Sequence, residues 1–161
     1  MLYSIAMKLL VGMVLGIAIV VVGAFLYFKL GYAPVATAAP PMPFETFMAK
    51  AALKATIAKQ AVVESPIQPD AANLAAGAQI YRDSCAVCHG LRGEAETGIA
   101  KGMFPKPPQL MKGKGVTDDP ASETFWKVKN GIRLTGMPGF GGSMTDQQMW
   151  QVSLYLQQGG K

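Results

Sequence analysis

Five consecutive residues, Cys85-Ala86-Val87-Cys88-His89, contain both cysteines and the only histidine of this 161-residue chain. A Cys-x-x-Cys-His run is the attachment sequence for a c-type haem. Its two thiols form thioethers with the haem vinyl groups, and its imidazole supplies one axial ligand to the iron. We therefore predict one haem c, bound through Cys85 and Cys88, with His89 as a ligand of the iron.

Three other chemistries use the same residue types. A disulfide between Cys85 and Cys88 is one. A thioredoxin-like redox pair is another, but that motif follows a strand, whereas residues 70–84 predict a helix. A structural zinc ion takes four Cys or His ligands, and this chain has three in total. The haem interpretation is therefore favoured over a redox dithiol or a disulfide.

A 20-residue run from Leu9 to Phe28 contains no charged residue and is bracketed by Lys8 and Lys29. At about 1.5 Å per residue, a helix of this length spans about 30 Å, the thickness of the hydrocarbon core of a bilayer. The alternative is a cleaved signal peptide with its cleavage site near Ala36-Thr37-Ala38, but the apolar region of such peptides is shorter, about 7–15 residues. We expect an uncleaved, single-pass anchor.

Composition divides the chain into three parts. Residues 1–30 form the anchor. Residues 31–69 begin with a stretch rich in proline and alanine, which favours extended conformations, and continue with a helix over 44–64, where apolar residues recur near helical spacing with lysines among them. This helix can lie on the membrane surface, pack on the rest of the protein or dock on a partner subunit, and the sequence does not decide among these. Residues 70–161 form the haem domain.

Capping residues predict three helices in the haem domain. Asp70 caps a helix that runs into the Cys-x-x-Cys-His motif. Pro120, at the first helical position, and Gly131, past the end, bound a second helix. Thr145 and Gln148 form the capping box of a third helix, which ends before the glycine pair near the C-terminus. No segment alternates as a strand does, so we expect an all-α fold.

The long connection between His89 and Asp119 is rich in glycine and proline. A structureless loop of this length normally argues against a compact domain. It is expected, however, where a loop wraps a large apolar cofactor. The haem then supplies core that the 92 residues of this domain would hardly build alone.

A low-spin electron-transfer haem needs a second axial ligand, and the chain has no second histidine. Methionine is the natural candidate, because paired His and Met ligands raise the reduction potential. Met137 lies in the run Gly136-Met137-Pro138-Gly139, where the glycines let the backbone approach the haem and the proline stiffens the loop. We predict Met137 as the ligand. The other methionines after the motif more often fill gaps in a core than bind metal; these are Met103, Met111, Met144 and Met149.

Three segments of residues 70–161 together resemble the class I monohaem cytochromes c. They are GAQIYRDSCAVCHG at 77–90, NGIRLTGMPGF at 130–140 and MWQVSLYLQ at 149–157. The resemblance implies a small bundle of helices around one haem, preceded here by a transmembrane helix and a partly extended, partly helical connector. It also implies that the first and last helices of the domain cross where Gly77 and Tyr81 meet Val152 and Tyr155.

The resemblance further suggests roles for residues near the haem. Members of the family usually place a proline carbonyl on the second nitrogen of the ligand histidine, and Pro107 or Pro108 fits that position better than Pro105. Trp126 and Arg133 are candidates for contacting a haem propionate. The alternatives are plain core packing for Trp126 and a solvated loop cation for Arg133.

Covalent haem attachment in this family takes place outside the cytoplasmic membrane. The resemblance therefore implies a single-pass protein of the cytoplasmic (inner) membrane whose haem domain faces the periplasm. The expected function is electron transfer, as a tethered carrier or as a relay subunit of a respiratory or photosynthetic complex. The expected partners are redox proteins or oxidoreductase subunits and the lipid bilayer, and no independent enzymatic activity is expected. The rival function is that of a gas-binding or peroxidatic haem protein with a labile sixth ligand.

The net charge of +5 does not indicate nucleic-acid binding. Residues 70–161 carry ten basic and eight acidic side chains, and no dense basic run is interleaved with aromatic residues. Lysines of the long connection are candidates for steering an acidic redox partner, with solubility alone as the alternative role. These are Lys101, Lys106, Lys112 and Lys114.

Overall fold

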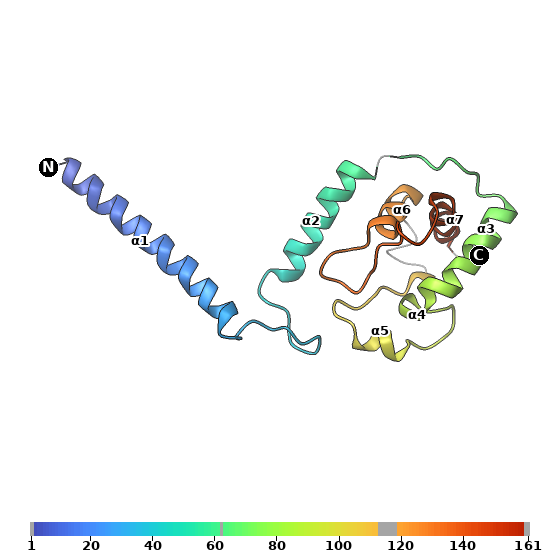
Figure 1. Cartoon of the computed structure of the whole chain (residues 1–161), viewed down its shortest axis with the longest axis horizontal. Coiled ribbons are helices and arrows are strands. Elements are labelled where there is room, and N and C mark those ends of the chain that lie inside the picture. Colours follow the sequence, from blue (N-terminus) through green and yellow to red (C-terminus); the bar gives the residue numbers. More distant parts are fainter. Residues whose placement is uncertain (1, 62, 113–118, 160–161) are drawn as a thin grey trace. The chain divides into compact units, whose positions relative to one another are not determined.

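The computed structural model describes residues 2–61, 63–112 and 119–159 (Figure 1). The chain divides into two compact units, Met1–Pro43 and Phe44–Lys161. Every regular element among the described residues is a helix, so the prediction of an all-α fold is confirmed.

The first unit contains the long helix α1 (Leu2–Lys29). The most apolar 18-residue window of its segment Ile5–Lys29 has a mean hydropathy of 2.9, and 0% of that window is buried. By length and composition this helix is able to cross a membrane, a property that signal sequences near an N-terminus share. The apolar run expected over Leu9–Phe28 thus lies within one continuous helix.

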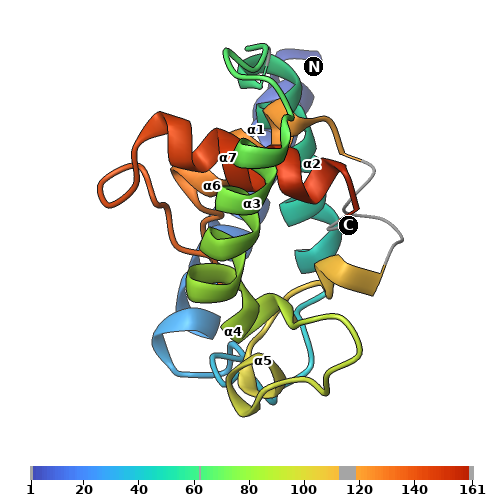
Figure 2. The same cartoon turned by 90° about the vertical axis from the view of Figure 1, so that its right-hand side faces the viewer.

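The second unit is a bundle of short helices, in which α3 crosses α7 (Figure 2). In chain order its elements are α2 (Glu45–Gln60), α3 (Ala71–Ile80), the π-helical turn η1 (Tyr81–Cys85), α4 (Ala86–His89), α5 (Gly98–Gly102), the 3₁₀ turn η2 (Leu110–Lys112), α6 (Ala121–Asn130) and α7 (Asp146–Gln157).

The predicted capping residues bound three of these helices. Asp70 accepts a hydrogen bond of 2.8 Å from a backbone N–H in the first turn of α3. Thr145 and Gln148 form the reciprocal capping box of α7. Gly131 ends α6 with a φ of 67°, a left-handed conformation that glycine adopts without strain. Pro120 is the N-cap of α6 rather than its first residue, so the helix begins one residue later than predicted.

Two segments differ from the sequence-based expectation. The helix expected over 44–64 ends at Gln60, ahead of two β-branched valines and the Ser65-Pro66 pair, which disfavour helix. The long connection after His89 contains the short helices α5 and η2. The side chain of Thr97 accepts a hydrogen bond from the first turn of α5, and this local cap was not recognised in the sequence.

The core forms where α3 crosses α7. Gly77 allows the close approach, because a Cβ at this position would lie 2.2 Å from the carbonyl oxygen of Gln151 and 2.9 Å from the Cβ of Tyr155. One turn later, Tyr81 is fully buried in the same cluster as Val152, and its ring centroid lies 6.0 Å from that of Tyr155. The predicted crossing of the first and last helices is therefore confirmed.

Candidate haem site

The Cys-x-x-Cys-His motif lies where helix α3 gives way to the π-helical turn η1 and the short α-helix α4. The N–H of Ala86 bonds to the C=O of Tyr81, five residues earlier, which makes η1 a π-type turn. Such turns occur often at functional sites. Cys85 is the last residue of η1, and α4 contains Cys88 and His89. Both cysteines are free thiols and half-buried.

A buried tyrosine fixes the end of this motif. The hydroxyl of Tyr81 donates a hydrogen bond of 2.7 Å to the carbonyl oxygen of Gly90, the residue directly after His89. Burial raises the pKa of Tyr81, so the hydroxyl stays protonated and remains a donor. Gly90 itself has a φ of 75°, which allows the chain to turn away from α4 at this point.

The imidazole of His89 is oriented by a proline carbonyl. Its Nδ1 lies 2.8 Å from the carbonyl oxygen of Pro108. Because a carbonyl only accepts, Nδ1 carries the proton and donates, which leaves the lone pair of Nε2 available to a metal. Burial lowers the pKa of His89, although the hydrogen bond to Pro108 opposes this effect. Of the three prolines considered from the sequence, Pro108 is the one that makes this contact, while Pro107 is half-buried beside it.

The thiol of Cys85 does not have the electrostatics of an attacking redox cysteine. Burial, and to a smaller extent the neighbouring Cys88, raise the pKa of Cys85 to about 11. Reactive dithiols instead have an attacking cysteine with a lowered pKa. The environment of Cys85 therefore does not favour disulfide exchange. Among the described residues, no group of three or more His, Cys, Asp and Glu side chains gathers to hold a metal ion.

Backbone contacts hold together the two arms of the loop that contains Met137. A Cβ at Gly131 would lie 2.6 Å from the backbone nitrogen of Gly139, so the two arms of the loop touch where both residues are glycine. The N–H of Ile132 donates to the carbonyl of Met137 at 3.2 Å, and the N–H of Phe140 donates to the carbonyl of α6 residue Val128 at 2.9 Å. Met137 is half-buried and packs against the cluster that contains Tyr81 and Met149.

The other methionines separate into core residues and one neighbour of this loop. Met149 is fully buried, as expected, and Met111 is 7% exposed in the same cluster. Met144 packs at the edge of that cluster. Met103, by contrast, lies against the loop, with its methyl carbon 2.0 Å from the place that a Cβ of Gly136 would take. Sequence reasoning gave Met103 no role beyond filling space.

The two candidates for a propionate contact lie in different surroundings. The indole N–H of Trp126 donates to the side-chain oxygen of Gln60 at 3.0 Å, so this ring connects α6 to the end of α2. Arg133 is exposed in the loop before Met137. Contact of either residue with a haem propionate stays a prediction.

The surroundings of His89 fit a large apolar cofactor. Leu110 and Met111, two and three residues after Pro108, are both buried, and the cluster to which they belong consists of apolar side chains and Tyr81. The amide of Gln109 is buried there without a hydrogen-bond partner for either its nitrogen or its oxygen, so it has capacity to bond a polar group of a ligand or a water. No local feature of the sequence pointed to Gln109.

The lysines considered for partner steering are only partly described. Lys101 is exposed, and the ammonium of Lys106 lies 4.0 Å from a carboxylate oxygen of Glu96. Lys114, and the side chain of Lys112, lie outside the described residues. Steering of a partner by these lysines stays a prediction.

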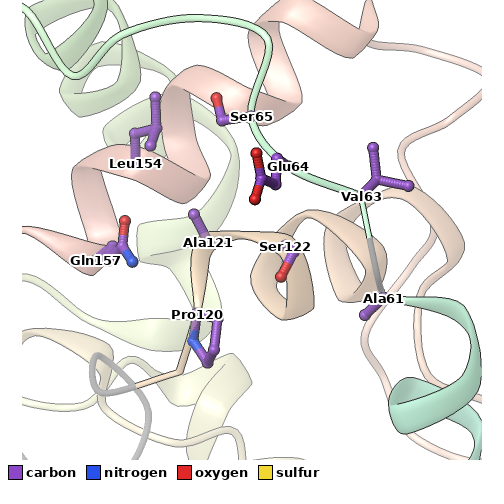
Figure 3. Close-up of a pocket in the computed structure, with 9 residues that line it drawn as sticks. All are labelled: Ala61, Val63, Glu64, Ser65, Pro120, Ala121, Ser122, Leu154 and Gln157. Carbon is purple, nitrogen blue, oxygen red and sulfur yellow. The ribbon is translucent and has the colours of Figure 1, made fainter.

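A pocket elsewhere in the second unit is separate from the haem candidates. It lies between the chain after α2, the start of α6 and the later part of α7 (Figure 3). None of the candidate haem residues lines it. The lining residues are Ala61, Val63, Glu64, Ser65, Pro120, Ala121, Ser122, Leu154 and Gln157.

Comparison with protein families gives one match over most of the second unit. The model of the family described as cytochrome C oxidase, cbb3-type, subunit III, matches residues 72–156. The match includes the Cys-x-x-Cys-His motif, the loop of Met137 and the last helix.

Curated relatives agree with this match. Cytochrome c6 of Limnospira maxima is 31% identical over 84 residues, which are 52% of this chain and 90% of that protein. Thiosulfate dehydrogenase of Stutzerimonas stutzeri is 32% identical over 102 residues, 60% of this chain and 31% of that protein. The cytochrome c subunit of the quinone-dependent alcohol dehydrogenase of Gluconobacter oxydans is 34% identical over 92 residues, 52% of this chain and 18% of that protein. The last two relatives are thus matched over less than a third of their length.

A solved structure shows the same fold. A chain of the reducing HAO-like protein complex of Kuenenia stuttgartiensis superposes with a TM-score of 0.52 at 23% sequence identity, over 60% of this chain and 49% of that chain.

Proposed function

We propose that this chain, which belongs to the c-type cytochrome family described as cytochrome C oxidase, cbb3-type, subunit III, transfers electrons through one haem c held by Cys85, Cys88, His89 and Met137. The observation that carries the proposal is the 2.8 Å contact between Nδ1 of His89 and the carbonyl of Pro108. It fixes the tautomer in which Nε2 is free to bind iron. When bound, a haem c supplies a one-electron iron couple whose potential depends on its axial ligands and burial.

The residues of the chain contribute rigidity and exclusion of water. The Pro108 carbonyl holds the imidazole, and the Tyr81 hydroxyl holds the backbone directly after it. The loop of Met137 is fixed by its own hydrogen bonds and by contacts between glycine backbones. A site held in this way changes little in geometry when its charge changes, and this favours electron transfer over bond-making chemistry.

We also propose that α1 anchors the protein in the cytoplasmic membrane and that the haem domain lies in the periplasm. The length and hydropathy of α1 support an anchor. A role as a carrier or as a relay subunit fits relatives that are named cytochrome c6 and the cytochrome c subunit of a quinone-dependent alcohol dehydrogenase. This chain matches only 18% of the latter relative. That relative therefore does not identify the electron donor or acceptor of this chain.

Covalent attachment is tested by mass spectrometry and a haem-stained denaturing gel of the full chain, expressed with a c-type haem maturation system. We expect the wild type to carry one haem per chain and to stain after denaturation. Cys85→Ala and Cys88→Ala should each weaken the stain, and the double variant should lose it. A wild-type chain with the mass of the bare polypeptide would overturn the proposal.

Carbon monoxide distinguishes electron transfer from the rival gas-binding function. With Met137 bound to iron, the ferrous wild type should take up carbon monoxide slowly at neutral pH, while Met137→Ala should bind it rapidly. Met103→Ala is the matched control, because Met103 lies against the same loop, and it should behave as the wild type does. Rapid uptake by the wild type would favour the rival, and rapid uptake by Met103→Ala alone would assign the ligand to Met103.

A further inference from the structure

The helix α2 packs one face on the haem domain. Ile57 is 6% exposed, Gln60 accepts the hydrogen bond of Trp126, and α2 lies beside α6 (Figure 1). A hollow between the two helices is lined by residues of both, among them Leu53 and Glu123. Of the three roles that the sequence left open for this helix, packing on the domain is the one observed. The face of α2 that packs on the domain contains Leu53, Ile57 and Gln60.

The opposite face of α2 is apolar and exposed. At about 100° per residue, Phe47 and Met48 lie away from Leu53 and Ile57, and Phe44 directly precedes the helix as its N-cap. Phe44, Phe47 and Met48 are 78%, 68% and 62% exposed. A helix that only covers a soluble core puts its large apolar residues inward and polar residues outward. We call Phe44, Phe47 and Met48 the outer patch.

The composition around the outer patch suits a lipid headgroup region. The helix carries three lysines, Lys50, Lys54 and Lys59, and a single acidic residue, Glu45. All three lysines are exposed. Exposed phenylalanines together with lysines also occur in helices that lie in the plane of a membrane interface and favour anionic lipids.

The chain keeps the outer patch close to a bilayer whenever α1 spans one. Fourteen residues, 30–43, separate the end of α1 from Phe44, and a chain of this length reaches at most about 50 Å. A short tether turns association with the same membrane into an intramolecular event with a high effective concentration. A weak lipid contact therefore suffices to hold the domain at the surface, whereas a free partner in solution gains nothing from the tether.

We propose that the outer patch inserts into the headgroup region of an anionic bilayer and holds the haem domain at the membrane surface. This inference rests on the proposed membrane anchor. Its consequence is that the domain works in the plane of the membrane, at the level of membrane-bound redox partners, instead of swinging freely on its connector.

The test releases the domain from its anchor. A specific protease site is inserted in residues 31–43 of the haem-loaded full chain, which is reconstituted in vesicles of phosphatidylcholine alone or of phosphatidylcholine with phosphatidylglycerol. After cleavage and sedimentation, haem absorbance is measured in pellet and supernatant. We expect the cleaved domain to stay with the phosphatidylglycerol vesicles, and high salt or phosphatidylcholine alone to release most of it.

Variants test whether the outer patch causes the retention of the cleaved domain on vesicles. Phe47→Ser with Met48→Ser should lower the partition of the cleaved domain by about tenfold or more, because two apolar side chains no longer leave water. Lys59→Glu should lower it with phosphatidylglycerol only. Val63→Ser is the matched control, since Val63 is 58% exposed but lies outside the patch. The absorbance spectrum of each variant verifies that the haem domain is folded.

Each failure has a separate meaning. Haem that stays in the supernatant before cleavage refutes the anchor, and with it the proposed membrane location. Haem that is anchored before cleavage but released from every vesicle afterwards refutes the lipid-binding patch alone. Retention in native membranes without retention in pure lipid indicates a protein partner, and a cleaved domain that sizes as a dimer indicates a second copy; either result overturns the proposal.

Discussion

Replacing Gly77 with alanine places one methyl group where α3 crosses α7. That methyl carbon would lie 2.2 Å from the carbonyl oxygen of Gln151 and 2.7 Å from its carbonyl carbon. Both obstructing atoms belong to the backbone of a helix, so no change of rotamer relieves the clash. The two helices have to separate by about 1 Å to restore ordinary contact, and protein interiors are packed too densely to absorb such a shift at no cost.

Two opposing effects set the size of the loss. Alanine is a better helix former than glycine by about 1 kcal/mol. Overfilling a well-packed core costs about 1–3 kcal/mol. Because the 2.2 Å approach at Gly77 lies far inside contact distance, we expect the clash to win, with a net loss of about 1–2 kcal/mol in the free energy of unfolding.

Thermal unfolding of the haem-loaded chain, followed by circular dichroism, measures this loss. For a domain of this size, each kcal/mol lowers the midpoint by roughly 4–8 °C. Gly98→Ala is the matched control, because Gly98 begins α5 and no atom lies within 4 Å of its Cβ position. It should leave stability unchanged or raise it by about 0.4–1 kcal/mol. Equal midpoints for the two variants would refute the close crossing at Gly77.

Three further variants test single contacts in the same unfolding assay. Tyr81→Phe removes the buried 2.7 Å hydrogen bond to a backbone carbonyl and should cost about 1–3 kcal/mol, since the carbonyl is left without its partner. Trp126→Phe removes the donor to Gln60 and should cost no more than about 1 kcal/mol, with an unchanged reduction potential; a shifted potential would instead indicate contact between the indole and a haem propionate. Asp146→Asn removes the ion pair with Lys129 at 2.8 Å and an acidic residue from the first turn of α7. Stability should therefore fall by less than about 1 kcal/mol at low salt. A loss that persists at high salt would contradict an electrostatic cause.

The parts of the fold that the sequence predicted correctly depend on chemistry within a few residues. The cap at Asp70 and the box of Thr145 and Gln148 each join positions three apart, so their residue types alone indicate a helix start. Gly131 ends α6 because it adopts a positive φ, again a property of one residue. The Cys-x-x-Cys-His motif is local in the same sense.

The parts that were not predicted depend on contacts between distant segments. A π turn uses the same residue types as an α turn, so nothing in residues 81–85 separates the two possibilities. The bond between Trp126 and Gln60 joins residues 66 positions apart. The packing of α2 was left open because apolar residues occur on both of its faces, and only the position of α6 determines that Ile57 is the buried one.

The helix crossing and the iron ligand are connected by a short series of contacts. Gly77 sets how closely α3 approaches α7, and one turn later Tyr81 packs into the core that this approach creates. The Tyr81 hydroxyl holds the carbonyl of Gly90, directly after His89, while Pro108 holds the imidazole from the other side. A separation of the helices at Gly77 should therefore displace one of the two supports of His89 and leave the other in place. For this reason we expect Gly77→Ala to alter the spectrum of the haem as well as the stability of the fold, whereas a defect confined to helix packing would leave that spectrum unchanged.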